Sequence, residues 1–297
     1  MVTSISQGSK CDSVKIAKYL TGYSTKNASA TYDEAFAKHV RSWKQSHGGL
    51  ATDQIGTQTW ALIADYAPKV DGSNKPAAYA LRLALGLSES AGYNSTLKNI
   101  IKQVRAGLGL SSSKICDTDM WRKVLTFSQA RNAHTINYKQ NDKRWGSIIY
   151  SKSGKDTGQY ISNSGCGPTS MASCVATLTS RKDITPVDMC DLAVRHGYRK
   201  SSGGTDTGFF AFASSLYGLR CVETTLTTVV KHCLDSGGIV ICRFKAGSWW
   251  TSCGHFSPMW MMDSKYYYVD NTISSIKIKR EVSKLAKDCK EYFCIYK

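Results

Sequence analysis

A degenerate internal repeat of about 60 residues fills the first 130 positions and limits most strongly how this chain can fold. Trp60 in the first half and Trp121 in the second each precede a short apolar run, and offsets of 60 or 61 residues relate most of the other apolar positions. Both halves show apolar residues at helical spacing (Val14, Ala17, Leu20; Leu97, Ile100, Ile101, Val104, Leu108). Repeats of this size are single supersecondary units. We therefore expect one or two small α-helical bundles, over residues 1–68 and 74–130.

Turn-forming residues predict how these bundles end. A Gly-Leu pair closes the long helix of each half, at Gly49-Leu50 and Gly109-Leu110, because glycine suits a left-handed C-terminal cap. The segment 68–76 (PKVDGSNKP) has the composition of a linker. A second boundary is expected near residues 128–134, ahead of a third segment, 137–297.

The third segment has the pattern of an α+β domain, with a helix first and a sheet later. Apolar residues follow Cys166 at helical spacing, through Leu178. Short strands are expected farther on, separated by turns, at 239–244, 255–262, 266–269 and 275–278. Pro258 falls inside the second of them and predicts a bulge or an edge position, since proline has no N–H to donate.

The charge points to polyanionic partners without choosing among them. The formal net charge is +17. Residues 1–130 hold 16 basic and 9 acidic side chains (+7), and the rest hold 23 and 13 (+10). Nucleic acid and anionic bacterial wall both fit a field of this sign. No apolar run is long enough to span a membrane, and the polar start of the chain lacks a signal peptide. The protein then acts inside the cell that makes it or leaves by another route.

The eleven cysteines contain no C-x-x-C pair, which argues against zinc ribbons and thioredoxin-like motifs. No metal-ligand spacing and no phosphate-binding glycine motif occurs, so neither a metal nor another cofactor is expected. Most of the cysteines are expected to be reduced, buried and structural.

Cys166 is the exception. Pro168 is tolerated in the first turn of a helix, so a helix is expected to begin near Cys166. Backbone N–H groups and the positive end of the dipole then lie beside the sulfur and favour the thiolate, which is the nucleophilic form. Glycines on both sides allow a sharp entry and close approach of a substrate backbone.

The base expected for this thiol is His255, which follows Gly254 and opens an apolar strand. His196 is expected at the end of a helix and His232 on an amphipathic helix, where each has an ordinary structural role. A turn at 263–265 makes the next strand a hairpin partner, and Asp270 at its end is expected to orient the imidazole. Asp263 is the rival, but it sits in the turn itself.

The first segment resembles the peptidoglycan-binding-domain-1 family. The resemblance rests on the opening Gly8-Ser9, on Val40 with Lys44-Gln45, on the turn from Asp53 to Gly56, and on Thr59-Trp60 through Ile63. Gln54 stands where the family prefers glycine, and the second segment matches only loosely. The resemblance implies three-helix bundles that dock on bacterial cell wall. Helical bundles that bind another target, or none, are the alternative.

Residues 137–297 resemble the C39-like family 2 peptidases of the papain-like superfamily. The matching motifs are 138–145 (YKQNDKRW), 165–170 (GCGPTS), His255-Phe256 and Asp270-Asn271. The resemblance implies a triad of Cys166, His255 and Asp270, with Gln140 supplying a side-chain N–H to the oxyanion hole beside the backbone N–H of Cys166. Asn271 replaces the family's proline. Gly203-Gly204-Thr205 resembles a loop that borders the substrate groove, and Trp249-Trp250 are either cleft or core aromatics.

These observations favour a peptidoglycan hydrolase of the phage endolysin kind, which cleaves amide bonds of wall peptides. Its partners are peptidoglycan and the anionic polymers attached to it, with no nucleic acid expected. Such a protein is stored in the cytoplasm and released to the wall at lysis. The alternatives are an N-acetylmuramoyl-L-alanine amidase with the same triad, a leader-peptide peptidase, and a non-catalytic protein that binds wall or nucleic acid.

Overall fold

The computed structural model describes residues 2–125, 136–151, 159–248, 251–262, 265–269, 277–279 and 287–297. The chain divides into two compact units, Met1–Ser128 and Gln129–Lys297. The second boundary expected from the sequence, Trp249-Trp250 and Asp270 all lie outside the described residues. No helix in the described part of the chain is both long and apolar enough to cross a membrane.

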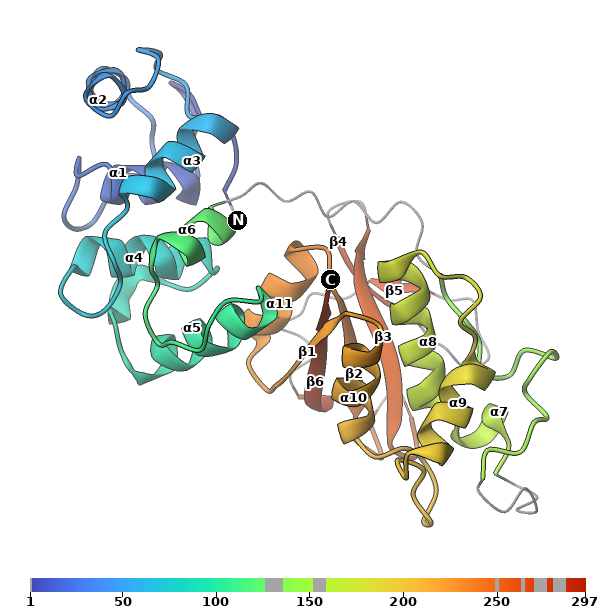
Figure 1. Ribbon diagram of the computed structural model, residues 1–297. Coiled ribbons are helices and arrows are strands. Elements are labelled where there is room, and N and C mark those ends of the chain that lie inside the picture. Colours follow the sequence, from blue (N-terminus) through green and yellow to red (C-terminus); the bar gives the residue numbers. More distant parts are fainter. Residues whose placement is uncertain are drawn as a thin grey trace. The chain divides into compact units, whose positions relative to one another are not determined.

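The first unit consists of two successive sets of three helices (Figure 1). The first set is α1 (Asp12–Leu20), α2 (Glu34–Ser46) and α3 (Thr57–Tyr66). The second set is α4 (Lys75–Ala84), α5 (Ser95–Gly107) and α6 (Thr118–Val124), with a short 3₁₀ turn, η1 (Glu89–Ala91), after α4. The middle helix of each set begins at a polar cap: the side chains of Asp33 and Asn94, 61 residues apart, accept the N–H groups of Phe36 and Leu97.

The two sets also close in the same way, through an extended segment that precedes the first helix. Ile5 pairs with Ile55 in the first set and Val70 with Cys116 in the second. The Trp60 indole donates to the Thr3 carbonyl at 3.0 Å, and the Trp121 indole to the Pro68 carbonyl at 2.9 Å. The segment 68–76 is therefore the first piece of the second repeat and not a free linker. Its turn-forming composition concealed Val70, which is fully buried.

A buried cation fixes the loop after the middle helix in each repeat. Lys44 Nζ donates to Thr52 Oγ1 at 2.5 Å and to the Gln54 carbonyl at 3.1 Å. Arg105, 61 residues later, donates to the carbonyls and side chains of the equivalent loop (Ser111, Ile115, Asp117). The left-handed residues that end these helices are Gly48 (φ 77°) and Gly109 (φ 71°). The cap expected at Gly49 is thus wrong by one residue. Equivalent residues of the two repeats are 61 positions apart here as well.

The second unit is an α+β domain built on an antiparallel sheet of six strands, in the order β1-β6-β2-β3-β4-β5. The strands are β1 (Arg220–Thr224), β2 (Ile239–Phe244), β3 (His255–Met262), β4 (Lys265–Val269), β5 (Lys277–Lys279) and β6 (Cys289–Tyr296). The helices are α7 (Ile161–Ser164), α8 (Cys166–Thr179), α9 (Pro186–Arg195), α10 (Gly208–Leu216) and α11 (Thr227–Asp235). The sequence predicted β2, β3, β4 and part of β5 but missed β1 and β6.

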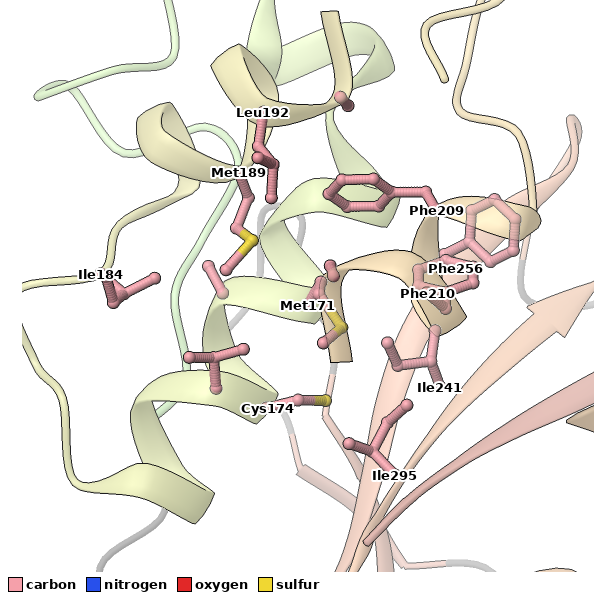
Figure 2. Close-up of a cluster of buried hydrophobic side chains, with 14 of the residues drawn as sticks. Met171, Cys174, Ile184, Met189, Leu192, Phe209, Phe210, Ile241, Phe256 and Ile295 are labelled. Atoms are coloured by element: carbon pink, nitrogen blue, oxygen red, sulfur yellow. The ribbon is translucent and has the colours of Figure 1, made fainter. Parts of the chain in front are cut away.

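Strand alternation divides the buried side chains of the sheet between two faces. Ile239 and Ile241 of β2, with Phe293 and Ile295 of β6, join one core with α8, α9 and α10. Figure 2 shows part of this core, with Phe256 of β3 beside the phenylalanines of α10. The intervening residues of β2 and β6 point to the opposite face, and α11 contacts these same strands. Helix α8, which carries the expected nucleophile, is therefore packed directly on the sheet.

Candidate active site

Cys166 is the first residue of α8, as the sequence predicts, and Pro168 lies in the first turn. The two neighbouring glycines are needed for packing within the protein itself. A Cβ at residue 165 would lie 2.7 Å from the carbonyl oxygen of Ile161, and one at residue 167 would lie 3.2 Å from the side chain of Thr205. The Gly203-Gly204-Thr205 loop is thus seated against the start of α8, and the side chain of Thr205 is buried.

The sulfur of Cys166 receives hydrogen bonds from the backbone N–H groups of Phe256 and Gly167. Phe256 is the second residue of β3, so the sulfur meets this strand one residue from His255. N–H groups two residues apart on a strand point to the same side. The nitrogen of Pro258 therefore points in the same direction as the N–H of Phe256, which is away from β2 and toward the side of β3 where Cys166 lies.

This direction explains how Pro258 is accommodated. The β2–β3 register runs without a shift through Ile241 and Pro258, so the bulge, one of the two expected alternatives, does not occur in this pairing. Among the described residues the β3–β4 register begins only at Met259. Proline therefore removes no bond of the β2–β3 ladder.

Burial dominates the protonation of the nucleophile. It raises the pKa of the Cys166 thiol, and the N–H groups of Phe256 and Gly167 lower it by less. The sequence predicted that backbone N–H groups would favour the thiolate, and they do act in that direction, but the net shift is upward because the thiol is withdrawn from water. A thiol in this state needs a neighbouring base before it can attack.

His255, the expected base, is the first residue of β3, where it lies opposite Phe244 of β2 and is partly buried. It precedes the residue whose N–H meets the sulfur, so the structure brings the strand of His255 to the start of α8. The predicted hairpin of β3 and β4 is confirmed, with Met262 opposite Lys265. Asp270, the expected orienting residue, lies outside the described residues.

Gln140 is buried and reaches the helix that precedes Cys166. Its side-chain Nε2 donates to the carbonyl oxygen of Ser162 in α7 at 2.5 Å. This acceptor fixes the orientation of the amide, because the opposite orientation would set two oxygens against each other. Its Oε1 is buried and meets no hydrogen-bond donor among the described residues. The hydrogen bond observed for Gln140 therefore fixes α7 at Ser162, which is four residues before Cys166 in the chain.

Sequence reasoning missed Arg199, which joins the segments around this site. Its guanidinium donates to the carbonyl oxygens of Tyr150 (2.5 Å) and Gly204 (2.7 Å) and to the side chain of Gln159. It also lies over the Tyr150 ring, 4.4 Å from the ring centre. The Tyr150 hydroxyl lies 2.9 Å from that of Thr205, which packs on Gly167. No sequence motif marks this arginine, since its partners come from three separate segments.

Two of the other histidines and two of the buried cysteines have structural environments. His196 is the C-terminal cap of α9, as expected. His232 is buried in α11, and burial lowers its pKa to about 4. All eleven cysteines lie in the described residues, and no disulfide joins any of them. Burial raises the pKa of Cys174 and of Cys190 well above its ordinary value, so neither is an available thiolate.

Comparisons with known proteins do not identify the chain: no protein-family model, no curated protein and no solved structure matches it. Any functional assignment therefore depends on the residues themselves.

Proposed function

We propose that this chain is a peptidoglycan hydrolase whose second unit is a papain-like cysteine peptidase domain of the C39-like kind. The observation that carries the proposal is the arrangement at the start of α8. Cys166 opens a helix packed on the sheet, and its sulfur meets the backbone N–H of Phe256, next to His255. Nucleophilic cysteine catalysis requires the thiol and the imidazole to come within hydrogen-bond reach, and we propose that His255 provides this imidazole.

The chemistry proposed is acyl transfer to sulfur. His255 takes the proton of the Cys166 thiol, and the sulfur attacks the carbonyl carbon of a wall amide bond. The tetrahedral intermediate collapses to a thioester as His255 returns the proton to the departing amine. Water activated by the same imidazole then cleaves the thioester and regenerates the thiol. By resemblance, the backbone N–H of Cys166 and the amide of Gln140 stabilise the oxyanion, and Asp270 orients the imidazole.

The first unit is proposed to hold the enzyme on the wall. In their described residues, its two helical repeats offer no counterpart of the nucleophile and base proposed for the second unit. Cys116 is fully buried, and His39 bonds to the backbone and side chain of Thr21. The charge of +7 over residues 1–130 favours the anionic polymers of the wall.

Digestion of purified peptidoglycan, with mass analysis of the fragments, tests the proposal. New amino-acid termini within the stem peptides are the expected result and indicate an endopeptidase. Glycan strands released with intact stem peptides would identify the amidase alternative, which the same triad can serve. Unchanged peptidoglycan, with the protein still folded and bound, would leave a non-catalytic wall-binding protein and overturn the enzymatic proposal.

A further inference from the structure

A group of aromatic side chains lies where α2 and α3 of the first repeat end, with Tyr66 exposed and Trp43 and His47 half-buried. The rings of Trp43 and His47 are stacked, with centres 4.1 Å apart and planes 19° apart. Tyr66 meets His47 edge-on at 4.5 Å and Trp43 at 6.3 Å. Leu50, on the loop after α2, is 80% exposed, and Tyr66 is 56% exposed. These four residues are called the aromatic platform below.

The fold does not require this platform, because the second repeat is built on the same scaffold without it. At the constant offset of 61, the residues equivalent to Trp43, His47 and Leu50 are Val104, Leu108 and Ser111. The equivalent of Tyr66 lies outside the described residues. The closing tryptophans and the buried cations recur in both repeats, whereas the ring stack occurs in the first alone among the described residues. Because the second repeat folds in the same way without the ring stack, the ring stack is better explained by ligand binding than by a contribution to stability.

The chemistry of the platform fits a sugar ring. Trp43 and Tyr66 offer apolar ring surface together with an indole N–H and a hydroxyl. Within the described part of the chain, neither group makes a hydrogen bond to another residue. Saccharides have the matching character, with C–H faces that stack on aromatic rings and hydroxyl or acetamido groups at their edges. The rings are already packed together, so little ordering cost remains for binding.

Two further properties argue against larger or charged partners. A protein–protein interface of ordinary size buries about 800 Å² on each side, far more than three rings and one leucine provide. The platform itself holds no acidic or permanently cationic side chain, although the unit around it is strongly basic. Polyanions would therefore bind elsewhere on the unit, and the platform is left for a neutral ligand.

We infer that the aromatic platform of Trp43, His47, Leu50 and Tyr66 is a binding site for the N-acetylated amino-sugar strand of peptidoglycan. The inference rests on the proposed wall-binding role and adds to it the ligand class and the residues. It assigns glycan recognition to the first repeat and leaves the second repeat without this site.

The test uses the full chain with Cys166→Ala, so that no ligand is consumed. The variant Trp43→Val/His47→Leu/Leu50→Ser gives the first repeat the residues that the second already accommodates, which preserves the fold. Tyr66→Ala is a second variant, because an exposed ring is removed with little effect on packing. Tyr23→Ala is the matched control: Tyr23 is also exposed and contacts a histidine ring, His39, at 5.0 Å, but lies outside the platform. The probes are N-acetylglucosamine oligomers, free stem peptide and peptide-free glycan strands, with binding followed by tryptophan fluorescence and calorimetry.

The expected result is that the triple variant and Tyr66→Ala bind glycan strands at least about tenfold more weakly than the parent, whereas Tyr23→Ala binds normally. Binding of the oligomers should also persist at about 0.5 M salt, where charge interactions are screened within a few ångströms. Undiminished glycan binding by the folded triple variant, or preference of the platform for stem peptide, would overturn the inference. Neither outcome would contradict the proposed hydrolytic activity. That activity is measured separately, as cleavage of soluble muropeptides by the same variants with Cys166 restored.

Discussion

The backbone N–H of Phe256 donates to the sulfur of Cys166, which connects the first residue of α8 to the second residue of β3. The N–H of Gly167 contacts the same sulfur. Two backbone donors stabilise a developing thiolate, and their positions are fixed by a helix and by a strand. His255 directly precedes Phe256, so a single strand supplies both a donor to the sulfur and the proposed base.

The first prediction concerns the pH at which Cys166 reacts. Because burial raises the pKa of this thiol, its alkylation by iodoacetamide should be slow at neutral pH and should keep accelerating above pH about 8.5, the ordinary range for cysteine. The measurement is peptide mapping after timed alkylation in a Cys253→Ser background, which removes the exposed thiol. A rate that is already at its plateau near pH 6 would instead indicate a preformed thiolate and contradict the upward shift.

The second prediction concerns Arg199. Arg199→Lys keeps the charge but loses the fork that joins Tyr150, Gly204 and Gln159, so the free energy of unfolding should fall by about 2–3 kcal/mol. Turnover should fall with it, because Thr205 would lose its support beside Gly167. Arg195→Lys is the matched control, since the Arg195 side chain is 63% exposed and forms a surface ion pair with Asp191. Equal effects of the two substitutions in urea unfolding and hydrolysis would show that Arg199 does not organise the site.

The start of α8 and the strands β2 and β3 could be predicted from the sequence because their signals are local. Pro168 permits a helix only in its first turn, and the apolar strands 239–244 and 255–262 have turn formers on both sides. The strand β6 was missed although residues 292–296 (YFCIY) form an apolar run typical of a buried strand; Lys290 and Glu291 interrupt the pattern at its start, and its partners β1 and β2 lie elsewhere in the chain. The turn-forming composition of 68–76 predicted a linker. In the structure Val70 is buried and pairs with Cys116, so the segment belongs to the second repeat.

The sequence suggests residues for the candidate site but does not predict their environment. Cys166 and His255 were singled out by their neighbours in the chain. The burial that raises the pKa of the thiol, and the contacts of Arg199, arise from segments far apart in sequence. Gln140 was expected beside the oxyanion, and its observed bond to Ser162 could not be inferred from a motif.

The third prediction concerns acid stability. Burial lowers the pKa of His232 to about 4, with Asp235 raising it and Lys231 lowering it by smaller amounts. The unfolded chain binds this proton near pH 6.5, so stability from His232 is complete above that pH and is lost as the pH falls toward 4. The loss amounts to at most about 3 kcal/mol. Urea unfolding of His232→Leu at pH 7, 5.5 and 4 should show a flatter dependence than the parent, and an identical slope in both proteins would contradict the assignment.

The fourth prediction ranks the members of the proposed triad. Loss of His255 should abolish hydrolysis about as fully as loss of the nucleophile, because the two act as a unit. Asp270→Ala should be milder, since orientation of the ring is its only proposed role. Initial rates on soluble muropeptides provide the comparison. An Asp270 variant that is less active than the His255 variant would require a different assignment of the base.

The most direct test of the central claim is the clearing of a purified wall suspension by Cys166→Ala beside a matched Cys174→Ala protein. Cys174 is a fully buried thiol of the same helix, and its loss should cost about 1 kcal/mol of stability while leaving hydrolysis intact. Cys166→Ala should bind the wall, unfold at a urea concentration close to that of the parent, and release no fragments. A folded Cys166→Ala protein that still clears the suspension would show that the proposed cysteine mechanism is wrong.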